Sequence, residues 1–103
     1  MIKIFRTIDG HIHQLNEASE GCWVVLANPT ATEILETANK FHIDQDDLRA
    51  PLDEEERSRI EVEDNYTLIL VDIPVIEERN EKDWFGTVPL GIIISEDMIF
   101  TVC

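Results

Sequence analysis

The side chains with the clearest potential for chemistry are carboxylates gathered between positions 46 and 64. Nine aspartates and glutamates lie in this stretch, and only Arg49, Arg57 and Arg59 offset them. Oxygen ligands suit hard cations such as Mg²⁺, which keeps several of its waters and uses one or two carboxylates. The spacing does not match an EF-hand loop, so a dedicated protein cage is not expected. Two interpretations stay open: a cation site, and a solvated acidic face, which is the commoner meaning of a charge run.

Two histidines are a second candidate for metal binding. His11 and His13 lie two residues apart on an expected strand and therefore share one face, a spacing that can hold a soft transition metal. No third nitrogen or sulfur ligand lies nearby in the sequence. A water-facing position beside Asp9 and Glu17 is therefore the favoured interpretation.

Signatures of catalysis are missing. The sequence contains no GxGxxG, no phosphate-cradling loop, no HExxH and no GxSxG. Cys22 and Cys103 both lie among apolar residues, which favours buried, reduced thiols over a disulfide or a nucleophile. We therefore expect a protein that is not an enzyme, and a small metal-dependent hydrolase is the most distant alternative.

The composition favours one soluble domain over residues 1–103. The chain has 103 residues, of which 44% are hydrophobic, and a net charge of −14. So negative a charge repels nucleic acid and anionic lipid, so neither is expected as a partner. No apolar run reaches the roughly 18 residues of a membrane span, and no signal peptide is recognisable, so a cytosolic location is the default. The chain ends inside an apolar strand pattern, which favours a fragment of a longer protein.

The elements that must position these side chains begin with three strands and two helices. Strands are expected at 1–5, 11–15 and 22–28, with Asp9-Gly10 as the turn between the first two. Thr30 and Glu33 form a capping-box pattern at the start of a helix. Its apolar stripe is expected to consist of Ile34, Leu35, Ala38 and Phe41. A second short helix is expected from Asp44, and Pro51 ends it at Ala50.

Four more strands complete the pattern. The alternation over 59–64 predicts a strand with Ile60 and Val62 inward and Glu61 and Glu63 outward, after a helix start or turn at 53–56. Strands at 66–76 and 84–95 are expected to flank a charged loop at 77–83, and a hairpin at 96–97 leads to the last strand. Trp23 is expected in the core. The predicted fold class is α/β, with a mixed, mostly antiparallel sheet of about seven strands and two helices inserted after the third strand, packed on the sheet.

Several of these features also occur together in a known family. They are the Asn-Pro before a capped helix at 28–33, the Phe-His-Ile-Asp helix end, the short helix ending at Leu48, the segment DEEERSRIEVEDNY, and the closing PLGIIISEDMIFTV. In this order they resemble the N-terminal cytoplasmic domain of the CorA-type magnesium/cobalt transporter family. The resemblance covers nearly the whole chain and is specific as an ensemble, although no single tetrapeptide would suffice.

The resemblance implies a regulatory domain on the cytoplasmic side of the cell membrane. In the family, a homopentamer senses intracellular Mg²⁺ through acids at subunit interfaces, and the bound ion favours the closed pore. It implies divalent cations as partners, Mg²⁺ bound weakly at subunit interfaces and no required cofactor. The long helix, two membrane helices and Gly-Met-Asn motif of the family are absent from this sequence, so the fragment itself is not expected to conduct ions. The alternative is a free-standing acidic interaction module.

One departure from the family affects the expected site. In relatives the sensing acids directly follow the leucine that matches Leu48, whereas Arg49 and Ala50 occupy those positions here. The sensor residues of the family therefore do not carry over. Proximity alone makes Asp46, Asp47 and Asp53 the metal-binding candidates.

Overall fold

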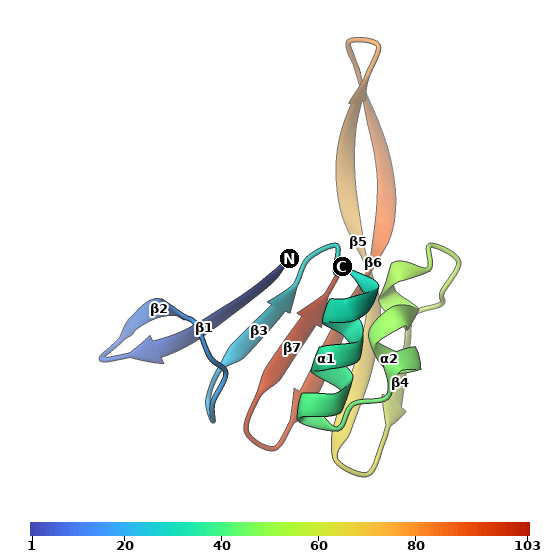
Figure 1. Cartoon of the computed structure of the whole chain (residues 1–103). Helices are drawn as coiled ribbons and strands as arrows, with labels where there is room; N and C mark the ends of the chain where they lie inside the picture. The colour runs from blue at the N-terminus through green and yellow to red at the C-terminus, as the bar shows by residue number, and fades with distance from the viewer.

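The computed structural model describes residues 1–103, and its elements form one seven-stranded sheet with two helices. They are β1 (Ile2–Ile8), β2 (His11–Leu15), β3 (Trp23–Leu26), α1 (Ala31–Phe41), α2 (Gln45–Arg49), the 3₁₀ turn η1 (Ala50–Leu52), β4 (Arg59–Val62), β5 (Tyr66–Arg79), β6 (Lys82–Ser95) and β7 (Ile99–Val102). The strand order is β2-β1-β3-β7-β6-β5-β4, and only β3 and β7 pair in parallel. Both helices follow β3 and lie over one face of the sheet (Figure 1). This confirms the predicted fold class.

The helices begin and end where the sequence indicates. The Thr30 hydroxyl accepts the Glu33 N–H and the Glu33 carboxylate accepts the Thr30 N–H, so the capping box is confirmed. His42 closes α1 in the left-handed conformation with φ 56°. The Asp44 carboxylate then accepts the Asp46 N–H at 2.8 Å and starts α2. The two helices carry the chain from the middle of the sheet to its edge at β4. Neither is long and apolar enough to cross a bilayer.

The core lies between these helices and the sheet. Its fully buried side chains come mainly from β3, β5, β6, β7 and α2: Val24, Leu26, Leu48, Leu68, Ile93, Phe100 and Val102. Ile34 and Ala38 of α1 join them as expected, but Leu35 is 44% exposed and Thr37 is buried in its place. The stripe of α1 is thus rotated by part of a turn from the predicted one.

Gly91 lets η1 approach the sheet closely. A Cβ built on Gly91 would lie 2.2 Å from Pro51 Cγ, well inside van der Waals contact. Both residues are buried. Because Gly91 has no side chain, the ring of Pro51 can pack directly on β6.

The other face of the sheet carries no helix, and we call it the open face (Figure 1). Trp23, Ile94 and Ile99 lie on it with 42–45% exposure, and register pairs Trp23 with Ile99 and Ile99 with Ile94. The prediction of Trp23 in the core is wrong, because the buried positions of β3 belong to Val24 and Leu26.

The orientation of β4 is also the reverse of the prediction. Glu61 pairs with Leu68, which is fully buried, and paired residues on neighbouring strands share a face. Glu61 therefore points to the helix side of the sheet, whereas Ile60 and Val62 face the open side with 68% and 79% exposure. Alternation alone cannot choose between the two faces of an edge strand, and here Glu61 lies on the helix side.

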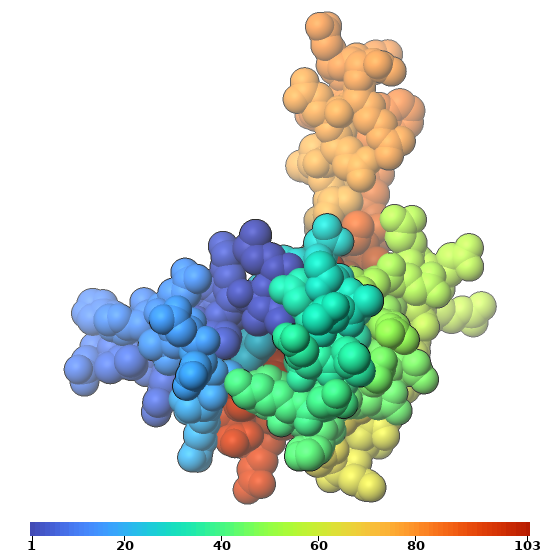
Figure 2. Space-filling view, viewed as in Figure 1, coloured from blue at the N-terminus to red at the C-terminus, as the bar shows by residue number.

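A long two-stranded ribbon, which we call the arm and define as residues 74–87, rises from the body (Figures 1 and 2). β5 and β6 stay paired up to Arg79 and Lys82, so the charged loop expected at 77–83 is instead strand with a tight turn. Asn80 and Glu81 make this turn with φ 52° and 62°, the pattern of a type I′ hairpin.

Two smaller predictions are resolved near the surface. Cys22 is buried but Cys103 is exposed, and both thiols are free, so only the first of the two expected buried thiols is confirmed. Residues 53–56 form a turn and not a helix start, and the Asp53 carboxylate accepts the Glu55 N–H at 2.9 Å.

Candidate cation site

Three carboxylates from different elements meet beside α2. Asp47 lies in α2, Glu61 in β4 and Glu63 just after β4, and one oxygen of each lies within 4.8 Å of the others. Two oxygens on opposite sides of one ion are about 4.2 Å apart for Mg²⁺ and about 5 Å for Ca²⁺, given the usual metal–oxygen distances. The three carboxylates, which we call the acidic cluster, are therefore close enough to contact a single hard cation.

Tyr66 fixes the position of Asp47 within the acidic cluster. Its hydroxyl donates to Asp47 Oδ2 in a short hydrogen bond and accepts the Asp44 N–H at 3.1 Å. Asp47 is only 9% exposed and Tyr66 only 7%. One buried hydroxyl thus links the first turn of α2 to β5 and leaves the second carboxylate oxygen of Asp47 without a protein donor.

Burial and crowding make the negative charge of the cluster costly. Burial raises the pKa of Asp47, and repulsion from Glu61 and Asp44 raises it further, against the hydrogen bond from Tyr66. Repulsion from Asp47 is the main cause of the raised pKa of Glu63. Burial and the hydrogen bond to Asp47 raise the pKa of Tyr66 above its ordinary value. A proton or a cation in the cluster would relieve this repulsion.

Arg59 neutralises only part of the cluster. Its guanidinium donates to Glu61 Oε1 at 2.7 Å and also contacts the Glu56 carboxylate and the Arg57 carbonyl. No Lys or Arg forms an ion pair with Asp47 or Glu63. These two acids are consequently the members of the cluster with charge left for a ligand.

Only one of the three sequence-predicted metal residues belongs to the cluster. Asp46 is exposed on α2, and Asp53 is exposed in the turn after η1; neither joins the cluster. Sequence reasoning did not place Glu61 and Glu63 beside Asp47, because it assigned the side chains of β4 to the wrong faces of the sheet. A usable signal was the phenol of Tyr66 at the start of a buried strand, since such a group needs a polar partner.

The two histidines lie apart from this site. His11 and His13 are exposed on β2, opposite Ile8 and Arg6 of β1. They are not part of any group of three potential metal ligands.

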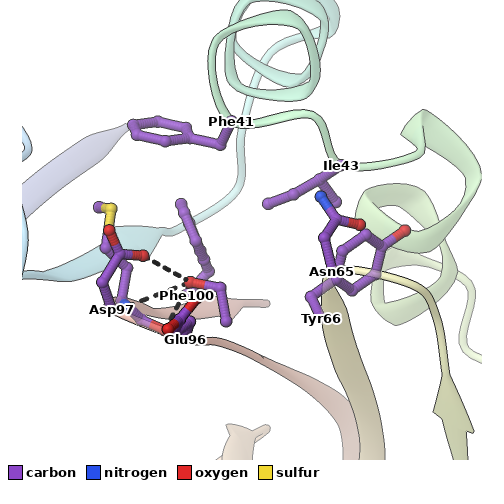
Figure 3. A pocket seen from close by; sticks show the side chains of 9 residues that line it. Phe41, Ile43, Asn65, Tyr66, Glu96, Asp97 and Phe100 are labelled. Carbon is purple, nitrogen blue, oxygen red and sulfur yellow. Dashed lines mark hydrogen bonds between the residues drawn. The ribbon is translucent and has the colours of Figure 1, made fainter.

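A cavity of about 310 Å³, which we call the hollow, is lined by the same Tyr66 that donates to Asp47; Figure 3 shows its lining side chains. Phe41 overhangs it from the end of α1, and Phe100 packs against Phe41 with ring centroids 5.0 Å apart. Glu96 and Asp97, in the turn between β6 and β7, lie at its polar side (Figure 3).

Comparisons with known proteins agree on one family. The family model described as "CorA-like Mg²⁺ transporter protein" matches residues 18–103. The chain is 30% identical over 80 residues to the cobalt/magnesium transport protein CorA of Methanocaldococcus jannaschii. The aligned residues make up 78% of this chain and 24% of that protein. The chain thus spans about a quarter of the length of this relative.

Two solved structures resemble the whole chain. The complete structure of the CorA magnesium transporter from M. jannaschii matches with a TM-score of 0.78 and 26% identity, over 99% of this chain and 32% of that one. The structure of the soluble domain of that CorA matches with a TM-score of 0.79 and 26% identity, over 99% and 40%. In both, less than half of the relative corresponds to residues 1–103.

Proposed function

The chain belongs to the CorA-like Mg²⁺ transporter family, and on that basis we propose that it is the cytoplasmic, ion-sensing domain of a divalent-cation transporter. The family is one of transporters and not of enzymes. The transported ion is proposed from the names of the relatives, which are described as cobalt/magnesium and magnesium transporters.

The acidic cluster is the observation that carries the sensing role. Asp47 is held in place by Tyr66 and is nearly buried, while Glu63 lies beside it without a basic partner. A hard cation with most of its waters retained needs only one or two such carboxylates. The cluster therefore supports Mg²⁺ binding through Asp47 and Glu63, with Glu61 held by Arg59 at its side.

Cation binding here would draw α2 and β4 together. Asp47 comes from the helix, and Glu61 and Glu63 come from the edge strand and its end, so their mutual repulsion acts between the two elements. An ion that contacts both sides replaces this repulsion with attraction. The position of α2 relative to the sheet would then depend on ion concentration, which is the property a sensor needs.

The energies involved are small for one site. At an ion concentration equal to its Kd, one site favours the bound state by about 0.4 kcal/mol, and five equal sites by about 2 kcal/mol. We propose that the full-length protein acts as a homopentamer, in which five such sites together bias the gate. The open face supports the proposal that this domain packs against further protein, since apolar surface of this extent is a common contact site.

Thermal unfolding in Mg²⁺ tests the sensing role. Mg²⁺ at ten times its Kd should stabilise the domain by about 1.4 kcal/mol, or about 5–10 °C in Tm, beyond the effect of NaCl at the same ionic strength. Asp47→Asn and Glu63→Gln should each abolish this difference, because each removes a ligand charge while keeping the side-chain shape.

Asp53→Asn provides the matched comparison. It also removes one carboxylate charge, but from the turn outside the cluster, so it should keep the Mg²⁺-specific shift. Equal shifts in Mg²⁺ and NaCl for the wild-type chain would reduce the effect to screening and refute the site.

A further inference from the structure

The hollow has apolar walls that are fixed by the packing of the core. Tyr66, Met98 and Phe100 are 7%, 8% and 1% exposed and line its buried side. Phe41 lies over the opening (Figure 3) and packs against the same core. A volume of about 310 Å³ is at the lower end of the range for small-molecule sites. The cavity therefore has room for a compact ligand with one ring.

The polar atoms left free in the hollow are mainly acceptors. The hydroxyls of Tyr66 and Ser95 both donate to other groups of the chain, and the Asn65 amide donates to a backbone carbonyl. Glu96 and Asp97 remain at the exposed side. Neither forms an ion pair, and Asp97 accepts only the Ser95 hydroxyl, at 3.3 Å. A ligand that satisfies these carboxylates must donate hydrogen bonds, and a positive charge strengthens them.

Lys40 approaches the hollow but does not neutralise it. Its ammonium group lies over the Phe41 ring, 5.5 Å from the ring centroid, and lines a separate cavity above β1. It is not among the residues that line the hollow. The net charge of −14 also raises the concentration of cations near the surface. The two acids are therefore available to a cation from solution.

A bare metal ion matches only half of this surface. Glu96 and Asp97 are neighbours in the turn between β6 and β7, and no third acid joins them to form a group of three ligands. An ion held by these two carboxylates would leave the apolar walls in contact with water, which is unfavourable. The combination of aromatic walls with free carboxylates instead fits a ligand that has an apolar body and a charged end.

From these observations we propose that the hollow binds a small organic cation, in which a short chain joins a primary ammonium group to an aromatic ring. The ring lies against Tyr66 and Phe100 beneath Phe41, and the ammonium group donates to the carboxylates of Glu96 and Asp97. Figure 3 shows these acids and Tyr66 on different sides of the cavity, so one ligand meets both surfaces. Binding requires no ion in the acidic cluster and is therefore independent of the proposed function.

A second cavity shares the same two acids and must be distinguished from the hollow. It opens beside Trp23 and Ile99, on the open face. These side chains are 42% and 45% exposed, whereas those on the buried side of the hollow belong to the core. The indole N–H of Trp23 and the backbone N–H of Tyr66 therefore report on different cavities in a nuclear magnetic resonance spectrum.

Titration of the isotope-labelled 103-residue chain with phenethylamine tests the proposal. Near neutral pH this primary amine is protonated, as a lysine side chain is. We expect a Kd of about 1 mM, which is reasonable for so small a ligand, with shifts at Phe41, Tyr66 and residues 95–98. Hydrocinnamate, an anion of similar size, and ethylamine, which lacks the ring, should each bind at least about tenfold more weakly.

Variants identify the groups that hold the amine. E96Q/D97N should raise the Kd about tenfold, because it removes both charges and keeps the side-chain shapes. E54Q/E55Q removes the same charge from exposed positions outside the hollow and should change the Kd less than about twofold. Phe41→Leu should raise it about fivefold through loss of the overhanging ring. Circular dichroism of each variant confirms that the fold is kept.

Glu63→Gln separates this proposal from the sensing role. It should lose the Mg²⁺-specific stabilisation but bind phenethylamine like the wild type, because Glu63 does not line the hollow. Equal affinity for phenethylamine and hydrocinnamate would overturn the proposal, as would an unchanged Kd in E96Q/D97N. Shifts at the Trp23 indole without shifts at Tyr66 would assign the amine to the other cavity and also overturn it.

Discussion

At the scale of single residues, Tyr66 and Asp47 determine the character of the acidic cluster. The Tyr66 hydroxyl both donates to the Asp47 carboxylate and accepts a backbone N–H from the start of α2. A hydrogen bond to a charged group typically contributes about 1.5–3 kcal/mol, and it makes the near-burial of an acid tolerable. The remaining cost appears as raised pKa values of Asp47 and Glu63, caused by burial and by mutual repulsion.

The raised pKa values predict the sign of the pH dependence. When the pKa of a carboxyl is higher in the folded than in the unfolded chain, the folded chain binds more protons between the two values. The contribution of Asp47 and Glu63 to stability is therefore largest in acid and is lost as pH rises from about 4 through their folded pKa values. The free energy of unfolding of Asp47→Asn, measured in urea, should depend less on pH over this window than that of the wild type. The stability of the variant relative to the wild type should therefore increase as pH increases.

Glu33 contributes a pH dependence of the opposite sign, and comparing wild type with Asp47→Asn at each pH removes it. Hydrogen bonds from Thr30 and the N-terminus lower the pKa of Glu33, so its contribution to stability rises with pH in both proteins. A difference between wild type and Asp47→Asn that is constant from pH 4 to pH 7 would contradict the prediction.

At the scale of elements, the contact of η1 with β6 sets how closely the helical layer approaches the sheet. Pro51 packs against the strand at Gly91, where any side chain would overlap its ring. Gly86 lies on the same strand, but a Cβ there would be 3.9 Å from Val75 Cγ2, which is ordinary contact distance. The same substitution at these two glycines therefore has different consequences.

Gly91→Ala should destabilise the chain by about 1–3 kcal/mol, because the new methyl group displaces η1 from a packed core. Gly86→Ala should change stability by less than about 1 kcal/mol, in the stabilising direction, since alanine restricts the unfolded chain more than glycine does. Urea unfolding of both variants measures the difference. Equal effects at the two positions would show that the Pro51 contact does not restrict the strand.

At the scale of the whole molecule, the chain combines one well-packed layer with two unsatisfied surfaces. The helix side of the sheet is closed, while the open face and the arm expose apolar side chains. The net charge of −14 adds repulsion between all parts of the surface. The body of the domain therefore holds its fold through the helix side, and the arm projects from it as a separate element.

Removal of the arm tests this division. Replacing residues 76–85 by Asn-Gly keeps the pairing of Val75 with Gly86, a pair of the same hydrogen-bonding type as Arg79 with Lys82, and closes the ribbon with a two-residue turn. We expect a change in the free energy of unfolding of less than about 1 kcal/mol, because the core residues lie outside the arm. A large loss of stability in urea would instead make the arm part of the cooperative fold.

The amino-acid sequence by itself determined the order of the elements and the ends of the helices. The capping box at Thr30, the cap at Asp44 and the turn at Asp9-Gly10 act through neighbouring residues, so local chemistry is sufficient to predict them. Alternation identified β4 as a strand, and the motifs in order indicated the family that the comparisons confirmed.

Only the tertiary structure decided which face of each strand is covered. Alternation in β4 is equally compatible with both orientations, and the pairing of Glu61 with Leu68 selected the one that brings Glu61 and Glu63 to Asp47. The arm likewise depends on the pairing of β5 with β6 across a charged sequence that suggests a loop. The site and the arm were thus beyond local reasoning, because both are products of contacts between strands rather than of any one segment.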